Sequence, residues 1–154
     1  MGGNPTWKVP SVALMVAIAL ATACADFDAP EDPAFGLPDV VVANPSFARD
    51  VQPIFATRCA TAGCHSATRQ QSGLDLSSEQ ASYANLVNQA SVSSSDRLLR
   101  VEPGDADNSW LVRRIEADPA RRDNLPRMPL AITPLTDNQI TTIVNWINQG
   151  AKRN

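Results

Sequence analysis

The clearest pattern of hydrophobic and polar positions in this chain lies near its C-terminal end. Apolar residues recur there at the i, i+3, i+4, i+7 spacing of one helix face, as Ile140, Ile143, Val144 and Ile147. Thr136 and Gln139 stand before this face at the two positions of a capping box. Gly150 follows it and is a natural terminator. The sequence therefore predicts a helix that begins after Thr136 and ends just before Gly150.

An earlier helix is predicted to lead directly into Cys59. Asp50 can cap its start, and Pro53 then falls in the first turn, where proline is tolerated. The apolar residues of this helix and its approach are Phe47, Val51, Ile54 and Phe55. The last three share one face, and the first can pack back on it as a hydrophobic staple.

Two shorter helices are predicted between these. Ser77 and Gln80 form a capping box for a helix through Leu86. Asp107 or Asn108 can cap another helix. The apolar members of that helix are Trp110, Leu111 and Ile115. No segment alternates apolar and polar residues convincingly, as a half-buried strand does, so the pattern predicts helices and loops.

The stretch between the last two helices is predicted to be an extended loop. Pro126, Pro129 and Pro134 keep residues 124–135 out of the helical conformation. Such a loop can direct one side chain inward, and the side chain it offers is Met128. In most proteins a lone methionine fills a gap in the core, but the place of Met128 between prolines favours a role as a metal ligand here.

The first residues read as an export signal. The stretch from Val12 to Ala23 is apolar except for Thr22, follows a segment whose only charge is Lys8, and is too short for a spanning helix. Residues 1–23 are therefore predicted to be a signal peptide. The end of this stretch, LATAC at residues 20–24, is similar to a bacterial lipobox, which predicts a lipidated Cys24; ordinary cleavage would leave Cys24 as an unpaired thiol.

Composition and charge separate a tether from a domain. Residues 24–45 hold five acids and four prolines with no sustained period, which predicts an extended, solvated linker. Residues 46–154 carry 12 basic and 11 acidic residues and form the predicted single domain. The chain without its signal carries about −4, which argues against a nucleic-acid partner. Aromatic residues make up only 5%, so the core is thin and leaves room for a buried cofactor.

The chemistry of the chain is concentrated in CATAGCH, residues 59–65. Two thiols can add across the two vinyl groups of a haem, and a histidine directly after the second thiol can then reach the iron. The standard attachment motif has two residues between its cysteines, whereas four separate Cys59 from Cys64. A bulge must accommodate the additional residues, and Gly63 can permit one.

Two other readings of the cysteines remain open. Cys59 and Cys64 can form a disulfide in an oxidising compartment, which leaves His65 unexplained. Two thiolates and one imidazole can also bind zinc, but no fourth nitrogen or sulfur ligand lies nearby in the sequence. His65 is the only histidine, and Met128 is the only methionine once Met1 and Met15 leave with the signal, so no bis-histidine site can form within one chain.

Several short pieces match one family in order. They are residues 50–55 (DVQPIF), 73–76 (GLDL), 101–105 (VEPGD), 108–111 (NSWL), 127–129 (RMP) and 143–151 (IVNWINQGA). The segment from about Phe47 to Ala151 thereby resembles the class I-like monohaem cytochrome c domain of bacterial secreted proteins and lipoproteins. The resemblance covers about two-thirds of the chain.

This resemblance implies an all-α, cytochrome c-like fold of about four to five short helices around one haem c, bonded through Cys59 and Cys64. It implies that His65 and Met128 are the axial iron ligands. Arg127, beside Met128, either pairs with a haem propionate or is a solvated loop residue. Likewise, Arg113 with Arg114 and Arg121 with Arg122 either form a docking face for an acidic partner or are simply solvated.

The function expected on these grounds is single-electron transfer between redox proteins that the sequence does not identify, rather than enzymatic catalysis. The expected location is the periplasmic side of a bacterial membrane, and the outer membrane is expected over the inner one. The lipid on Cys24 would be the anchor. Two alternatives remain open. Without ligation by Met128, a five-coordinate haem would bind gases or act on peroxide. Without haem, the chain would be a disulfide-containing lipoprotein with a binding or structural role.

Overall fold

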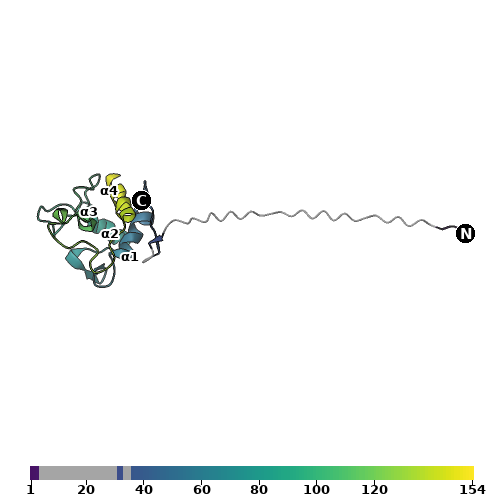
Figure 1. Ribbon diagram of the computed structural model, residues 1–154, viewed down its shortest axis with the longest axis horizontal. Coiled ribbons are helices and arrows are strands. Elements are labelled where there is room, and N and C mark those ends of the chain that lie inside the picture. Colours follow the sequence, from purple (N-terminus) through teal and green to yellow (C-terminus); the bar gives the residue numbers. More distant parts are fainter. Residues whose placement is uncertain (4–30, 33–35) are drawn as a thin grey trace.

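The computed structural model describes residues 1–3, 31–32 and 36–154, so Cys24 and all but the first three residues of the predicted signal peptide lie outside the described residues. The described part contains four α-helices, α1 (Gln52–Arg58), α2 (Glu79–Leu86), α3 (Trp110–Ile115) and α4 (Asp137–Asn148) (Figure 1). A π-helical turn, Phe47–Val51, runs into α1, and 3-10 turns occupy Gln71–Gly73 and Ala120–Arg122. Two short antiparallel ladders pair β1 (Glu31–Asp32) with β2 (Leu37–Pro38) and β3 (His65–Ser66) with β4 (Arg69–Gln70). The sequence pattern predicted neither ladder. No helix of the described residues is long and apolar enough to cross a membrane.

The apolar core lies where α1 and its preceding turn meet α4. Phe47 stacks on Trp146 with ring centroids 4.8 Å apart, and it meets Phe55 edge to face at 6.3 Å. Ile143 and Ile147 of α4 are fully buried beside them. These contacts confirm that the apolar stripe of α4 and the staple residue Phe47 face the core.

The predicted capping box of α4 is present. The Thr136 hydroxyl accepts from the backbone N–H of Gln139, and the Gln139 side chain accepts from the backbone N–H of Thr136. Gly150, at φ +94°, follows the end of the helix. This helix is therefore bounded by local signals that can be identified in the sequence alone.

The predicted caps of the two middle helices are wrong. The α2 cap is Ser78, because Ser77 already donates both its backbone N–H and its hydroxyl to the carboxylate of Asp75. The α3 cap position is Ser109. Asn108 instead donates to the Asp105 carboxylate in the preceding turn.

The predicted cap of the first helix is also displaced. The helical path begins at Phe47 rather than after Asp50, and the Ser46 hydroxyl caps it. Asp50 reciprocates by accepting from the backbone N–H of Ser46 at 2.7 Å. Pro53 does lie in the first turn of α1, as expected.

Residues 39–43, here called the strap, hydrogen-bond to α4 instead of being solvated as the linker prediction had it. The Thr136 hydroxyl donates to the Asp39 carboxylate, and Val42 bonds both Thr142 and Asn145. Asn154 lies close by, because its side chain accepts from the backbone N–H of Phe47 at 2.9 Å. Polar side chains of α4 thus satisfy the extended backbone of the strap.

Candidate functional site

The backbone between Cys59 and His65 forms a closed loop at the end of α1. Cys59 and Ala60 both donate their N–H groups to the Phe55 carbonyl, which ends the helix. Cys64 donates to the Thr61 carbonyl at 3.0 Å, and His65 donates to the Cys59 carbonyl at 3.1 Å. Gly63 lies in the left-handed region at φ +85°. The two additional residues of the motif are therefore absorbed by a turn, as the prediction about Gly63 requires.

His65 is oriented by its own ladder and by one side-chain hydrogen bond. Its Nδ1 lies 3.1 Å from the Gln71 carbonyl. Because a carbonyl only accepts, Nδ1 carries the proton in the neutral ring, and Nε2 is left with the lone pair that binds a metal. Burial lowers the pKa of His65, and the charges of Arg100 and Arg114 lower it further, against hydrogen bonds to the backbone of Gln71 and Leu74. Burial therefore favours the neutral ring, and the Nδ1 hydrogen bond favours the tautomer with the lone pair on Nε2.

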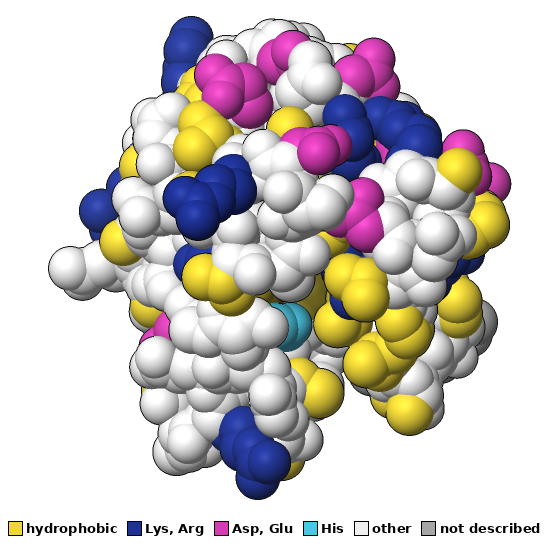
Figure 2. All heavy atoms as spheres, turned by 90° about the vertical axis from the view of Figure 1, so that its left-hand side faces the viewer, with side chains coloured by type: hydrophobic (Ala, Val, Ile, Leu, Met, Phe, Trp, Pro, Cys, Tyr) yellow, Lys and Arg dark blue, Asp and Glu magenta, His cyan; other side chains and the backbone are white. Residues whose placement is uncertain are grey.

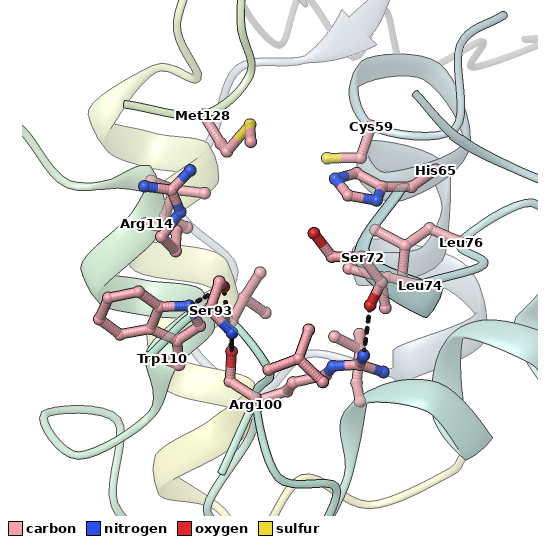
Figure 3. A pocket seen from close by; sticks show the side chains of 15 residues that line it. Cys59, His65, Ser72, Leu74, Leu76, Ser93, Arg100, Trp110, Arg114 and Met128 are labelled. Carbon is pink, nitrogen blue, oxygen red and sulfur yellow. Dashed lines mark hydrogen bonds between the residues drawn. The ribbon is translucent and has the colours of Figure 1, made fainter. Parts of the chain in front are cut away.

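Met128 reaches the site from the loop before α4. Its backbone N–H donates to the Arg114 carbonyl at 2.8 Å, at the end of α3. Its side chain lies partly buried against the apolar core. Figure 3 shows Met128 on one wall of a cavity, opposite Cys59 and His65, with both sulfur atoms directed into the space between.

Two adjoining cavities fill this space, of about 360 and 120 Å³. Cys59, His65, Ser72 and Met128 line both. The smaller cavity has an apolar lining of leucines and isoleucine, namely Leu74, Leu76, Leu86, Leu111 and Ile115. The larger cavity falls within the roughly 300–1,000 Å³ of cofactor sites. Figure 2 shows the histidine at the bottom of an opening bordered by hydrophobic side chains.

The two cysteines are both present as thiols and differ in their surroundings. Cys59 is 9% exposed, and burial raises its pKa to about 12 although the charge of Arg58 opposes the shift. Cys64 is only partly buried and lines the larger cavity together with Cys59. The predicted pair thus borders one cavity, with its first member inside the protein.

Arg127 does not line either cavity. Its Nε donates to the Ile115 carbonyl at 2.6 Å, which satisfies one of the carbonyls that the end of α3 leaves without a helical partner. The structure therefore places Arg127 at the end of α3 rather than in the lining of the two cavities.

Two other arginines, which the sequence analysis did not assign to the site, do line the smaller cavity. Arg114 lies 5.9 Å over the Trp110 ring, and its Nη1 is buried without a hydrogen-bond partner among the described residues. Arg100 donates to the carbonyls of Asn85 and Ser72. The sequence feature that indicates this place for Arg114 is helical spacing, because Arg114 follows Trp110 by four positions and Leu111 by three and so shares their helix face.

The residues present fit a haem. They supply two thiols, one imidazole, one thioether on the opposite wall, an apolar lining and a guanidinium whose Nη1 has no hydrogen-bond partner among the described residues. Within the part of the chain that the structure describes, no group of three or more His, Cys, Asp and Glu side chains is assembled for a metal ion. Comparison with protein-family models, curated proteins and solved structures finds no match to the chain.

Proposed function

We propose that this protein is a single-electron carrier with one haem c, bonded through Cys59 and Cys64 and ligated by His65 and Met128. One observation carries the proposal: the only histidine of the chain and the only methionine outside the signal face each other across an apolar cavity that Cys59 also lines. The cavity is bordered by four residues of the chemistry that a c-type haem requires.

Each residue has a defined task in this proposal. Cys59 and Cys64 hold the macrocycle by thioether bonds, so that it is not lost outside the cell. His65 presents Nε2 because the Gln71 carbonyl holds the proton on Nδ1. Met128 supplies a thioether, a ligand that favours the reduced state. The leucines and Ile115 exclude water from the site. The bound haem supplies the one-electron iron chemistry, and no substrate has to bind.

The acidic groups of the cofactor are assigned to Arg114 and Arg100 instead of Arg127. In haem the vinyl and propionate groups lie on opposite edges, so a haem bonded through Cys59 and Cys64 would carry its propionates away from the cysteines. Figure 3 shows Arg100, Ser93 and Trp110 at the end of the cavity away from Cys59 and Met128, and Arg114 along one side of the cavity. The buried Nη1 of Arg114 is the donor that a carboxylate would satisfy.

The decisive experiment is haem analysis of the protein exported in a host with haem attachment machinery. We expect a reduced pyridine haemochrome of c type and colour that stays with the polypeptide after acid and organic extraction. The double variant Cys59→Ala/Cys64→Ala is the matched control and is expected to lose all covalent colour. A wild-type polypeptide with no covalent haem would contradict the proposal.

We extend the proposal to export and anchoring through Cys24, which lies outside the described residues. The lipobox-like end of the apolar segment supports it. Cells labelled with a radioactive fatty acid should yield a labelled wild-type protein in the membrane fraction and an unlabelled Cys24→Ser variant. Equal labelling of both, or of neither, would remove the anchor from the proposal and leave the haem unaffected.

A further inference from the structure

The loop that carries Met128 is held at its far end by one buried arginine. Arg58 is the last residue of α1 and is 1% exposed. Its Nη2 donates to the carbonyls of Thr133 and Pro134, at 2.5 and 3.0 Å. Hydrogen bonds from a charged donor are stronger than those between neutral groups. The end of α1 is therefore tied directly to the residues that follow Met128.

The near end of the same loop is held by α3. Met128 donates its N–H to the Arg114 carbonyl, and Arg127 donates to the Ile115 carbonyl. Between the two anchors, apolar burial does little to define the loop, because Leu130 and Ile132 are 48% and 38% exposed. The position of the loop is therefore determined at its two ends, where the hydrogen bonds of α3 and Arg58 act, the latter beside the buried Leu135.

The place of Arg58 in the chain makes its anchor specific to the site. Arg58 directly precedes Cys59, whose sulfur points into the cavity opposite Met128 (Figure 3). Arg58 also lines the larger cavity together with both residues. One side chain thus links the wall that holds the cysteines and histidine to the loop that forms the opposite wall.

We propose, on the basis of the function proposed above, that Arg58 is the positioning residue for Met128. It holds the loop at the separation from the Cys59 and His65 wall at which the thioether reaches the iron. Arginine suits this role because the two N–H groups of its Nη2 are fixed in the plane of the guanidinium and bond two consecutive carbonyls, whereas the lysine ammonium rotates at the end of a flexible stem.

The test uses the full exported haem protein with Arg58→Met and Arg58→Lys, and with Arg69→Met in exposed β4 as the matched control. Pyridine haemochrome measures attachment, and the methionine-to-iron charge-transfer band of the ferric protein measures ligation. We expect wild-type haem content in all three, loss of the band in Arg58→Met, a weakened band in Arg58→Lys and an unchanged band in the control. Carbon monoxide should bind ferrous Arg58→Met about tenfold faster or more, the shift expected when a charge-assisted hydrogen bond is lost from a closed state.

The possible failures are distinguishable. A wild-type band in Arg58→Met overturns the positioning role alone. Wild-type protein with covalent haem but no methionine band overturns the positioning role and the ligation by Met128, and leaves the haem in place. Wild-type protein without haem overturns both proposals. If Arg58→Met does not accumulate, amide hydrogen exchange measured on the Arg58→Lys variant decides whether Arg58 has the positioning role. Faster exchange confined to residues 128–135, with α4 unchanged, supports the role, and unchanged exchange overturns it.

Discussion

The half of the domain built by α1 and α4 is held together differently from the half around the cavity. In the first half, here called the helix half, aromatic rings and aliphatic side chains fill the interior, as with Phe47 stacked on Trp146. In the second half, here called the cavity half (residues 65–135), buried aliphatic side chains such as Leu76 and Leu86 line a hollow, and polar side chains bond the backbone around it. Arg100, for example, donates its Nη1 to the Asn85 carbonyl at 2.8 Å.

This difference indicates which half would gain contacts from a bound cofactor. Close-packed apolar contacts stabilise a structure with no ligand, whereas side chains that line a hollow lack partner atoms on one side. The helix half is therefore expected to keep its structure without a cofactor. The cavity half is expected to gain contacts when the proposed haem is bound, and the following variants test this contrast.

The largest effect is expected from Trp146→Ala in the helix half. Removal of a buried tryptophan side chain costs about 3–5 kcal/mol, because the stacked Phe47 ring then borders a void. Denaturant unfolding measures the loss. Trp110→Ala in the cavity half is the matched variant and should cost clearly less in the haem-free protein, since the ring already borders a hollow. Equal losses would contradict the distinction between the halves.

Arg114→Met should have opposite effects in the two states of the protein. With haem attached, it should lower stability by about 1.5–3 kcal/mol, the range for a hydrogen bond to a charged group. In the Cys59→Ala/Cys64→Ala background it should be neutral or stabilising, because the buried Nη1 has no partner to lose among the described residues. Thermal melts of both forms measure the difference. Arg113→Met, which loses only surface hydrogen bonds, should change the stability of the haem-bound and haem-free forms by the same amount.

Gly63→Ala tests the turn that accommodates the longer cysteine spacing. No neighbour lies within 4 Å of the added Cβ, so the cost comes only from φ +85° and should be about 1–2 kcal/mol. The yield of covalent haem and the unfolding midpoint should both fall. Both quantities should fall less in Gly63→Asn, because asparagine tolerates this conformation better. Equal behaviour of the two variants would mean that the turn is not strained.

The smallest effect is expected where the two ends of the described domain meet. Asn154→Ala removes the side-chain acceptor of the Phe47 N–H and should cost about 1 kcal/mol, as for other caps. The free energy of unfolding should fall by the same amount with and without haem, because the contact belongs to the helix half. Lys152→Ala, at an exposed neighbouring position, is the control. A loss confined to the haem-bound form would contradict this assignment.

The sequence alone predicted those parts of the fold whose signals are local. Thr136, Gln139 and Gly150 define α4 within one short stretch, and the structure has the same boundaries. The caps near Ser77 and Asn108 failed because neighbouring aspartates bind those side chains, and a propensity for capping does not say which of two adjacent polar residues is already engaged.

The candidate site was predicted as a set of residues but not as an arrangement. Cys59, His65 and Met128 line one cavity, and the order of residues along the chain named all three. Arg114 was not assigned although it shares a helix face with Trp110 and Leu111, whereas Arg58 could not be assigned, because its role depends on which loop lies against the end of α1. The docking of the strap on α4 is equally a contact between distant segments, and its acidic, proline-rich composition gives no sign of it.

The strap and Asn154 lie on the same side of the domain as α4, whereas the view from the opposite side shows the opening with the histidine inside it (Figures 1 and 2). Immobilising the protein on a bead or an electrode through either of these segments would consequently leave the mouth of the cavity facing the solution. The same geometry suits a fused fluorescent or affinity label, which would occupy the back of the molecule without screening whatever approaches the front.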